Sequence, residues 1–565
     1  MADFDAIVVG SGMSGGWVAK ELAERGFKVL VLERGRNIDP SEDYTDHLSP
    51  WQIADMPDLT EEELQRDYPV QRSVYAFSKT NVKYWVKDSD HPYETTPGTS
   101  YTWRRGYHLG GRSVMWARQS YRLSPMDFEA NARDGHGVDW PVRYDDIAPW
   151  YSHVERFAGI SGTEENLPQL PDSDFLPPFE MTCVEDMVRG VIEQRWPGRR
   201  MIPARLAHLR QARDVHKELG RLSCQARSRC EQGCVFGAYF SALSSTLPAA
   251  ERTGNTTILT DSIVDSITYD ERAQRVTSVQ VIDRLTKDKK TYTARAVFLN
   301  ASAIASAMIL LNSRSSAFPN GLANTSDQVG RNLMDHVSGG YARALFDEFP
   351  DRYYVGRRPG GIYIPRYVNV QDQDEDFVRG FAYQGSAVRV GWSSDRPGIG
   401  DALKQANRQP GPWTFWLRAF GEVLPNPDNR VTLHPTRMDK WGSPIPVLSA
   451  KHGENERKLM QRASRDAKEM LEAAGGRVIY TSEDRPIELS PPGDMIHEMG
   501  TVRMGRDPQT SVLNKWNQAH DVPNLFVTDG GFMTSSACQN PSLTYMAFSA
   551  RAAHYAADLM QQGVL

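Results

Sequence analysis

The stretch Asp5-Ala-Ile-Val-Val-Gly10-Ser-Gly-Met-Ser-Gly15 decides the fold class of this 565-residue chain. Its apolar start predicts a buried strand, and its glycines follow the spacing Gly-x-Gly-x-x-Gly. A helical pattern continues over residues 17–25, and a second apolar strand over residues 28–32 ends on Glu33. In this order the glycines allow a tight turn and close approach of a pyrophosphate, whose charge the helix N-terminus favours. The stretch therefore predicts a dinucleotide-binding βαβ unit.

Glu33 lies 18 residues after Gly15, where a carboxylate can accept hydrogen bonds from both ribose hydroxyls of an adenosine without a 2′-phosphate. The motif alone does not separate FAD from NAD. Its place at the extreme N-terminus, with a long chain after it, favours FAD. The cofactor contacts expected in this unit are Gly10, Ser11, Gly12, Ser14, Gly15, Glu33 and Arg34.

The composition is that of an ordinary globular protein, long enough for a large core and two domains. A formal net charge of −6, without a Lys/Arg-rich patch, argues against nucleic acid as the main partner. The first residues lack the basic region and cleavage site of a signal peptide, and we expect no transmembrane segment. The most apolar run, residues 296–311, predicts a buried strand that turns into a helix.

Six further segments resemble the glucose-methanol-choline (GMC) oxidoreductase family. They are His108-Leu-Gly-Gly-Arg-Ser-Val-Met-Trp-Ala117, Asp139-Trp-Pro141 with the following residues 144–151, the strand around Val264, Val329-Gly-Arg-Asn-Leu-Met-Asp-His336, Asn524-Leu-Phe-Val-Thr-Asp-Gly530 and Gln539-Asn-Pro-Ser-Leu-Thr544. The resemblance covers the chain except parts of residues 340–490. It implies an α/β protein with a Rossmann-like FAD-binding domain and a substrate domain built on a mostly antiparallel sheet with helices. We assign residues 1–165, 216–340 and 490–565 to the first domain, and residues 166–215 and 341–489 to the second.

The resemblance also implies further contacts to the flavin. They are Gly110, Gly111, Ser113, Met115, Trp116, Ala117, Val264, Asp529, Gly530, Asn540, Pro541 and Leu543. Some related oxidases link the flavin covalently to the histidine of a Thr-His-Trp step. The corresponding step here is Val114-Met-Trp116, which implies a non-covalent flavin.

Two residues resemble the catalytic pair of the family. His497, in Ile-His-Glu-Met-Gly, is expected to accept the hydroxyl proton of an alcohol, because an imidazole titrates near neutral pH. Asn540 is expected to hydrogen-bond the same oxygen. The alternatives are a buried structural histidine and a turn before Pro541, which a catalytic role does not exclude. We interpret His336 as structural and His520 as a loop residue.

Cys224, Cys230 and Cys234 lie within eleven residues and suggest a bound metal or redox centre. Bacterial sugar dehydrogenases of the family carry a similar cysteine cluster, and this resemblance implies an iron–sulfur cluster of the 3Fe-4S type. The alternatives are unliganded thiols, a labile disulfide, or zinc with His216 as fourth ligand.

Within the family, the chain resembles catalytic subunits of FAD-dependent sugar dehydrogenases, most of all glucoside 3-dehydrogenase. This implies oxidation of a sugar or glycoside hydroxyl, favoured at C3, with electrons leaving through the cluster to a cytochrome or quinone-linked acceptor. The rivals are a sugar oxidase using oxygen, action at C1 or another carbon, and a non-catalytic flavin-binding partner. A small subunit carrying an export signal would place the protein in the periplasm; otherwise it is cytoplasmic.

For two regions the sequence allows two interpretations each. The acidic segment 37–72 predicts a surface excursion or a lid. Trp413, Phe415 and Trp416 could stack on a sugar ring, although strand periodicity favours core and sheet-face positions for them.

Overall fold

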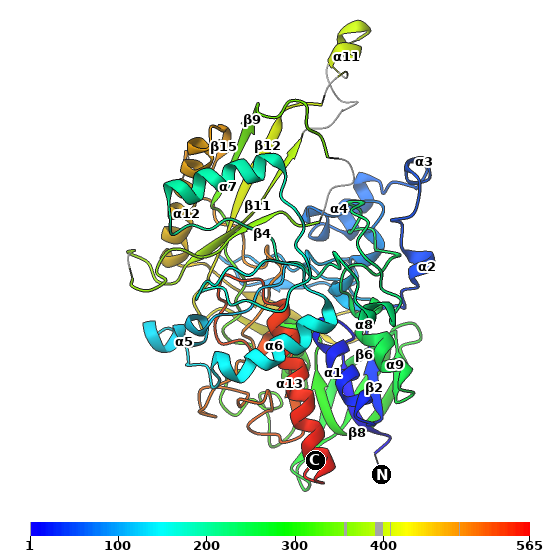
Figure 1. Cartoon of the computed structure of the whole chain (residues 1–565). Coiled ribbons are helices and arrows are strands. Elements are labelled where there is room, and N and C mark those ends of the chain that lie inside the picture. The colour runs from blue at the N-terminus through cyan, green and yellow to red at the C-terminus, as the bar shows by residue number, and fades with distance from the viewer. Residues whose placement is uncertain are drawn as a thin grey trace.

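The fold is known from a computed structural model that describes residues 2–354, 359–373, 375–389, 399–406, 408, 410–484 and 486–565. Two large sheets form its two halves, with the chain termini near one another at the end opposite the helix α11 (Figure 1). The α-helices are α1 (Met13–Glu24), α2 (Pro40–Asp43), α3 (Pro50–Ala54), α4 (Glu61–Asp67), α5 (Pro125–Asp134), α6 (Tyr144–Ala158), α7 (Cys183–Arg195), α8 (Asp214–Lys217), α9 (Thr246–Arg252), α10 (Ala303–Asn312), α11 (Asp401–Ala406), α12 (Glu454–Ala473) and α13 (Ser542–Gln561).

The first sheet contains the predicted nucleotide-binding unit and has the order β5-β2-β1-β8-β7-β6, with β16 also paired to β8. Its strands are β1 (Phe4–Val9), β2 (Val29–Leu32), β5 (Thr256–Leu259), β6 (Ser262–Asp270), β7 (Arg275–Asp283), β8 (Lys289–Leu299) and β16 (Leu525–Val527). The pairs that involve β1, β2, β5 and β16 are parallel, whereas β6, β7 and β8 form an antiparallel meander. The expected βαβ unit is therefore confirmed. Its helix begins at Met13, earlier than the apolar pattern predicted, because Gly12 in extended conformation already caps it.

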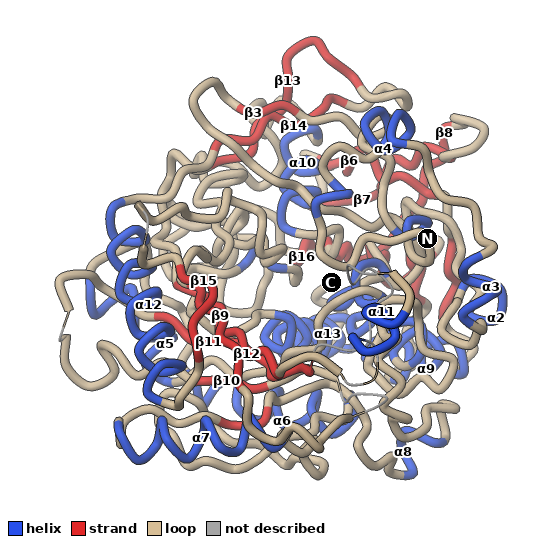
Figure 2. The backbone as a smooth tube through the Cα atoms, turned by 90° about the horizontal axis from the view of Figure 1, so that it is seen from above, coloured by secondary structure: helices blue, strands red, loops and turns tan. Residues whose placement is uncertain are grey.

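The second sheet is antiparallel throughout and has the order β15-β9-β12-β11-β10-β4. Its strands are β4 (Ile202–Pro203), β9 (Tyr341–Phe346), β10 (Ile362–Ile364), β11 (Phe381–Arg389), β12 (Trp413–Gly421) and β15 (Arg477–Thr481). A third, small sheet joins β3 (Glu94–Thr95) to β13 (Arg430–Met438) and β14 (Pro444–Ser449). Helix α12 packs against the second sheet at β9, β12 and β15 (Figure 2). The expected fold class, nucleotide sheet plus antiparallel sheet, is confirmed, while the domain boundaries stay a prediction.

Helices α1, α6 and α13 pack together on one side of the first sheet (Figure 1). The contact face of α13 is rich in alanine, and Ala553, Ala556 and Ala557 are fully buried in one cluster with Val18 and Leu22 of α1. Small side chains let the two helices approach closely. This packing matters for the site, because α1 begins at the glycine motif and α13 begins directly after Asn540 and Pro541.

No helix among the described residues combines the length and apolarity needed to cross a membrane.

Candidate active site

A cavity of about 820 Å³ runs from the glycine motif to the second sheet. His497 lines it together with most of the residues expected to bind the cofactor. These are Gly10, Ser11, Gly12, Ser14, Glu33, Arg34, Gly111, Ser113, Met115, Trp116, Ala117, Val264, Asp529, Gly530, Asn540 and Pro541. Segments far apart in the sequence thus share one space, although which of them touch a cofactor stays a prediction.

Three expected contacts stand behind the cavity wall instead. A Cβ on Gly15 would lie 1.9 Å from the carbonyl oxygen of Gly10, so this glycine permits the tight turn. Gly110 has φ 79°, a conformation that glycine adopts without strain, and Leu543 is fully buried in the core. These residues help to shape the wall, and their expected contacts to the cofactor stay a prediction.

Glu33 organises the glycine loop. Its carboxylate accepts hydrogen bonds from Ser11 N (3.2 Å), Ser11 Oγ (2.6 Å) and Gly35 N (2.9 Å). Burial raises the pKa of Glu33, and these hydrogen bonds oppose the shift. A carboxylate offers about four lone-pair positions, so acceptor capacity remains for a ribose hydroxyl.

The cavity has the features that FAD would require at its nucleotide end. Buried Asn300 Oδ1 and Arg34 Nε have no hydrogen-bond partner among the described residues, and both residues line the cavity. Val264 lies on β6, the edge strand of the first sheet, where a bulge follows it, so one side of its backbone has no neighbouring strand. Unsatisfied buried groups are costly, so a polar ligand fits here.

His497 is held at the cavity by an unusual turn. The preceding residue, Ile496, has φ 65°, which is rare for a β-branched residue. The buried carboxylate of Asp335 spans this turn by accepting from Met495 N (2.9 Å) and His497 N (2.9 Å). Burial, and next the nearby Glu498, raise the pKa of Asp335 to about 7. The turn is thus stabilised by a group that comes from the predicted family segment 329–336.

The predicted catalytic pair is brought together. Asn540 Nδ2 lies 3.1 Å from His497 Nε2, and Asn540 Oδ1 accepts a hydrogen bond of 2.6 Å from Gln384 Nε2 on β11. Burial holds the pKa of His497 well below its usual value, and the positive charges of a protonated His336 ring and of Arg112 lower it further. A neutral imidazole at the cavity is available to accept a proton. Gln384 was not foreseen from the sequence, which carries no local signal for it.

His336 lies beside His497 rather than in a remote structural position. The two rings are nearly perpendicular, with centroids 4.8 Å apart, and their Nδ1 atoms are 2.7 Å apart. The other ring nitrogen of His336 lies 2.8 Å from the carbonyl oxygen of Ala537. The interpretation of His336 as structural stays a prediction, and the structure adds that its ring contacts that of His497.

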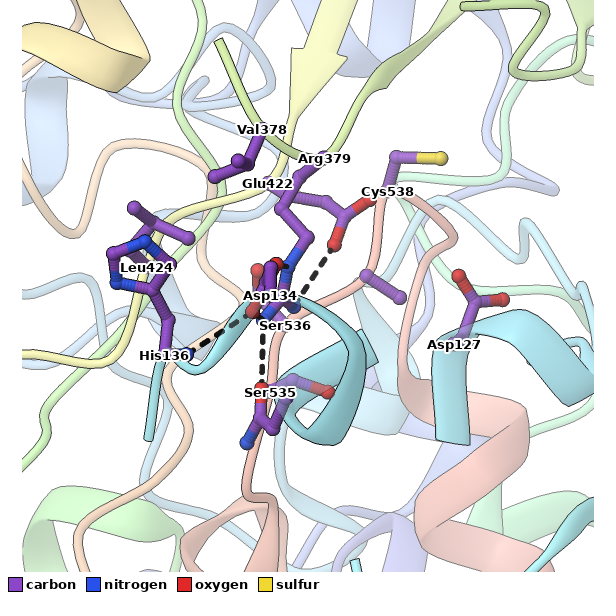
Figure 3. A network of polar contacts seen from close by, with 12 residues as sticks. Asp127, Asp134, His136, Val378, Arg379, Glu422, Leu424, Ser535, Ser536 and Cys538 are labelled. Atoms are coloured by element: carbon purple, nitrogen blue, oxygen red, sulfur yellow. Dashed lines mark hydrogen bonds and ion pairs between the residues drawn. The ribbon is translucent and has the colours of Figure 1, made fainter. Parts of the chain in front are cut away.

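A buried charge network supports the segment that carries Asn540 (Figure 3). Arg366 donates to Glu422 (2.8 Å), and Arg379 contacts both Glu422 (3.5 Å) and Asp134. Nearby, Gln539 Nε2 donates to Asp127 on α5 (2.9 Å). Cys538 is buried in this network, and burial raises its thiol pKa well above the usual value, so it is an unreactive core thiol.

The end of the cavity beyond His497 mixes rings with polar groups. Trp416 and Phe420 of β12 line it, whereas Trp413 and Phe415 are buried in the core. The alternation of core and sheet-face positions that the strand periodicity predicted is therefore confirmed, and Trp416 is the tryptophan of this strand that faces the cavity. The polar groups at this end are Arg118, Gln119, Glu231, Gln384, Arg418 and Asp494.

The three clustered cysteines lie on the loop between α8 and the 3-10 turn Ala242–Ser244. All are free and half-buried, and Cys230 Sγ lies 3.6 Å from His208 Nε2. Burial raises the pKa of Cys230 to about 11, which nearby Arg118 opposes and the neighbouring Cys224 and Cys234 reinforce. Glu231, the next residue, lines the cavity, so this loop reaches the site.

His216 does not serve as a fourth ligand. Its Nδ1 accepts from Arg213 N (3.0 Å), and its Nε2 lies 3.2 Å from the carbonyl oxygen of Arg156. Among the described residues, possible ligand atoms lie within 4.8 Å of one another at Glu21–His153–His554 and at Asp335–His336–His497, and the three thiols do not form such a group. A single zinc ion on these thiols is therefore disfavoured, whereas a polynuclear cluster places each thiolate on its own iron.

The first of these groups ties three helices together. Both imidazoles lie 2.7 Å from the Glu21 carboxylate, and the ammonium of Lys20 lies 3.1 Å from it. The carboxylate is satisfied, and the adjacent cation disfavours a metal.

Comparisons with known proteins agree with this architecture. Family models described as GMC oxidoreductase match residues 4–338 and 425–549. The chain is 27% identical to the fructose dehydrogenase large subunit of Gluconobacter japonicus, over 99% of this chain and 98% of the relative. It is 28% identical to 2-methyl-1,2-propanediol dehydrogenase of Mycolicibacterium austroafricanum, over 98% of this chain and 94% of the relative. The solved structure of pyridoxine 4-oxidase from Mesorbium loti superposes with a TM-score of 0.62 at 18% identity, covering 98% of this chain and 99% of that one. The chain therefore belongs to the GMC oxidoreductase family, the FAD-dependent enzymes that oxidise hydroxyl groups of alcohols and sugars.

Proposed function

We propose that the protein is an FAD-dependent dehydrogenase that oxidises a ring hydroxyl of a sugar or glycoside, at C3 of glucosides before other positions. The observation that carries the catalytic part is the approach of Asn540 Nδ2 to His497 Nε2 at 3.1 Å on the cavity wall. A substrate oxygen that takes the place of this contact would meet one hydrogen-bond donor and one proton acceptor.

The residues divide the work of alcohol oxidation. Bound FAD supplies the two-electron acceptor for the hydride that leaves the carbinol carbon. His497 Nε2 receives the hydroxyl proton, so the alcohol becomes a carbonyl compound. The Asn540 amide donates to the oxygen while negative charge develops on it, and Gln384 fixes the orientation of that amide.

The sugar proposal is supported by the polar and aromatic end of the cavity. Trp416 and Phe420 offer apolar faces, and Arg418, Glu231 and Gln384 offer charged and polar groups for hydroxyls. The relative with fructose in its name points in the same direction. A panel of methyl glucosides, free sugars and diols, assayed by anaerobic flavin bleaching, tests this, with the carbonyl position assigned by NMR. A product oxidised at C1 or at another carbon would replace C3 in the proposal.

For the electrons, we propose exit through a 3Fe-4S cluster on Cys224, Cys230 and Cys234. The support is the number of free thiols on one loop and the position of this loop at the cavity. The relative named as a large subunit supports partner subunits. We propose a small subunit that carries an export signal, periplasmic placement, and a cytochrome or quinone-linked acceptor.

Iron and sulfide analysis with EPR tests the cluster. Cys230→Ser should abolish the EPR signal, whereas Cys183→Ser, which alters a free half-buried thiol on another element, should not. Iron-free protein that forms peroxide rapidly on addition of sugar would favour the rival, an oxidase with unliganded thiols.

His497→Ala tests the catalytic assignment directly. It should bind FAD and lose flavin bleaching by substrate. His520→Ala is the matched control, because His520 contacts Ser511 Oγ (3.1 Å) away from the cavity. Unchanged bleaching in His497→Ala would refute the assignment.

A further inference from the structure

A chain of hydrogen bonds starts at the carbonyl oxygen of Ala537 and leads through His336 and His497 to Asn540. His336 is fully buried, with Nε2 at 2.8 Å from Ala537 O and Nδ1 at 2.7 Å from His497 Nδ1. A carbonyl oxygen only accepts, so His336 Nε2 carries a proton. Burial lowers the pKa of His336 to about 4, so the ring is neutral and its Nδ1 holds a lone pair.

The remaining protons follow from this starting point. Because His336 Nδ1 accepts, His497 Nδ1 carries the proton that is shared between the two rings. A neutral His497 then has its lone pair on Nε2, which faces the Asn540 amide nitrogen at 3.1 Å. Asn540 Oδ1 is left to accept from Gln384, at 2.6 Å. Each donor in the chain meets one acceptor.

We propose that His336 is a positioning residue that holds His497 in the tautomer able to accept a proton at the cavity. The proposal rests on the proposed function, since it gives His497 Nε2 the role of base. His336 itself touches neither the cavity nor a reacting atom.

The opposite tautomer fails on two contacts at once. If His336 carried its proton on Nδ1, this proton would point at the Nδ1 proton of His497. The clash would be avoided only if His497 carried its proton on Nε2, where it would point at the Asn540 amide nitrogen. The opposite tautomer of His336 would also leave the Ala537 carbonyl without its donor. Nor does the short Nδ1–Nδ1 distance leave room for a metal ion, because two zinc–nitrogen bonds of about 2.0 Å need a wider separation.

The carbonyl that starts the chain is placed by strained backbone. Ala537 has φ 54°, the left-handed region that alanine rarely adopts. The segment is held on both sides of it: Ser536 Oγ contacts Val423 O (3.2 Å), and Gln539 Nε2 donates to Asp127 (2.9 Å). The buried charges around this segment are shown in Figure 3. One segment therefore supplies both Asn540 and the anchor for His336.

The contact between His336 Nδ1 and His497 Nδ1 also stabilises His497 after it has taken up a proton. When His497 takes up a proton at Nε2 it becomes a cation, and its Nδ1–H donates to the neutral His336 ring. A hydrogen bond to a charged donor is stronger than one to a neutral donor, so His336 favours the protonated product. The other charged groups around His497 are Asp335, Glu498 and the Arg112 guanidinium, which pairs with Glu498 at 2.7 Å.

The test compares His336→Leu with His336→Asn in the holoenzyme. Both remove the contact to Ala537, but the Asn side-chain oxygen can still accept from His497 Nδ1, whereas Leu cannot. We expect flavin reduction about 100-fold slower in His336→Leu, with the acid limb of its pH profile about one to two pH units lower. In His336→Asn we expect a rate within about tenfold of the parent and an acid limb close to it.

The outcomes separate this inference from the proposed function. A His336→Leu enzyme that binds FAD and shows the parental acid limb overturns the positioning role, even where His497→Ala is inactive. Bleaching that survives in His497→Ala overturns the proposed function itself. If His336→Leu fails to bind flavin, His336→Asn is the deciding variant. The inference is overturned if flavin reduction in His336→Asn is more than about 100-fold slower than in the parent and its acid limb differs from the parental one.

Discussion

Replacing Asn540 by Asp should harm catalysis more than replacing it by Ala, although Asp has almost the shape of Asn. The amide donates from Nδ2 toward His497 Nε2 and accepts from Gln384 at Oδ1. A carboxylate keeps the second contact and reverses the first, because it has no proton to donate at neutral pH. His497 would then be drawn into the protonated form, which cannot act as a base.

The magnitude follows from two effects. Loss of one donor to a developing oxyanion slows catalysis by about 10² to 10³-fold, and both variants suffer it. A carboxylate about 3 Å from an imidazole also raises the imidazole pKa by about one to three units, and only the Asp variant suffers this. We therefore expect the acid limb of the flavin reduction rate to move upward by about one to three pH units in Asn540→Asp and not in Asn540→Ala.

Anaerobic stopped-flow reduction of the bound flavin, followed from pH 5 to pH 10, measures both effects. Asn426→Asp is the matched control, because it adds the same charge at an exposed position and should leave the profile unchanged. The reasoning is refuted if Asn540→Asp keeps the parental acid limb, or if it reduces flavin faster than Asn540→Ala below neutral pH.

Three further predictions concern the scaffold. Gly15→Ala should abolish retention of FAD, because its Cβ would lie 1.9 Å from a backbone oxygen, whereas Gly190→Ala on α7 meets open space and should bind normally in a flavin absorbance assay. Glu422→Ala leaves the buried Arg366 and Arg379 without their shared partner and should lower the free energy of unfolding by about 3–5 kcal/mol. The control Asp186→Ala removes an exposed ion pair and should lower it by less than about 1 kcal/mol. Equal midpoints of the two variants in denaturant would contradict this. Burial lowers the pKa of His108 to about 4, so only the unfolded state binds this proton between pH 6.5 and pH 4, and stability falls as the pH falls through that window; His108→Gln should flatten the slope by up to about 1.4 kcal/mol per pH unit, and an unchanged slope would count against it.

The nucleotide-binding half could be predicted because its signals are local. The strand, the glycines and Glu33 lie within 29 residues, and each makes its contacts to the others. The family resemblance likewise led to His497 and Asn540, and strand periodicity left Trp416 for the cavity. These inferences need no knowledge of how distant segments meet.

The contacts that orient His497 could not be predicted in the same way. His336 is 161 residues from His497 and 201 residues from Ala537, and Gln384 is 156 residues from Asn540. No periodicity or capping pattern relates residues at such separations. The sequence shows His336 within a family segment, but its hydrogen-bond partner is the carbonyl oxygen of Ala537, whose left-handed conformation no sequence pattern predicts.

The acidic excursion and the cysteine loop, read separately from the sequence, form one unit in the structure. Thr45 N donates to Gln232 O (2.9 Å), Arg229 donates to Leu48 O (2.5 Å), and a Cβ on Gly233 would meet the Tyr44 ring. Whether segment 37–72 is a surface excursion or a lid therefore also matters for the loop that carries the three thiols.

The cysteine loop reaches the cavity through Glu231, and residues 73–76, which directly follow the acidic segment 37–72, line the cavity as well. One backbone hydrogen bond, from Thr45 N to Gln232 O, and one side-chain hydrogen bond, from Arg229 to Leu48 O, join the excursion to the loop that carries the thiols. Under the proposed function, His497, Asn540 and Gln384 carry out the chemistry at the hydroxyl without any thiol, which leaves the cysteine loop for the proposed exit of electrons.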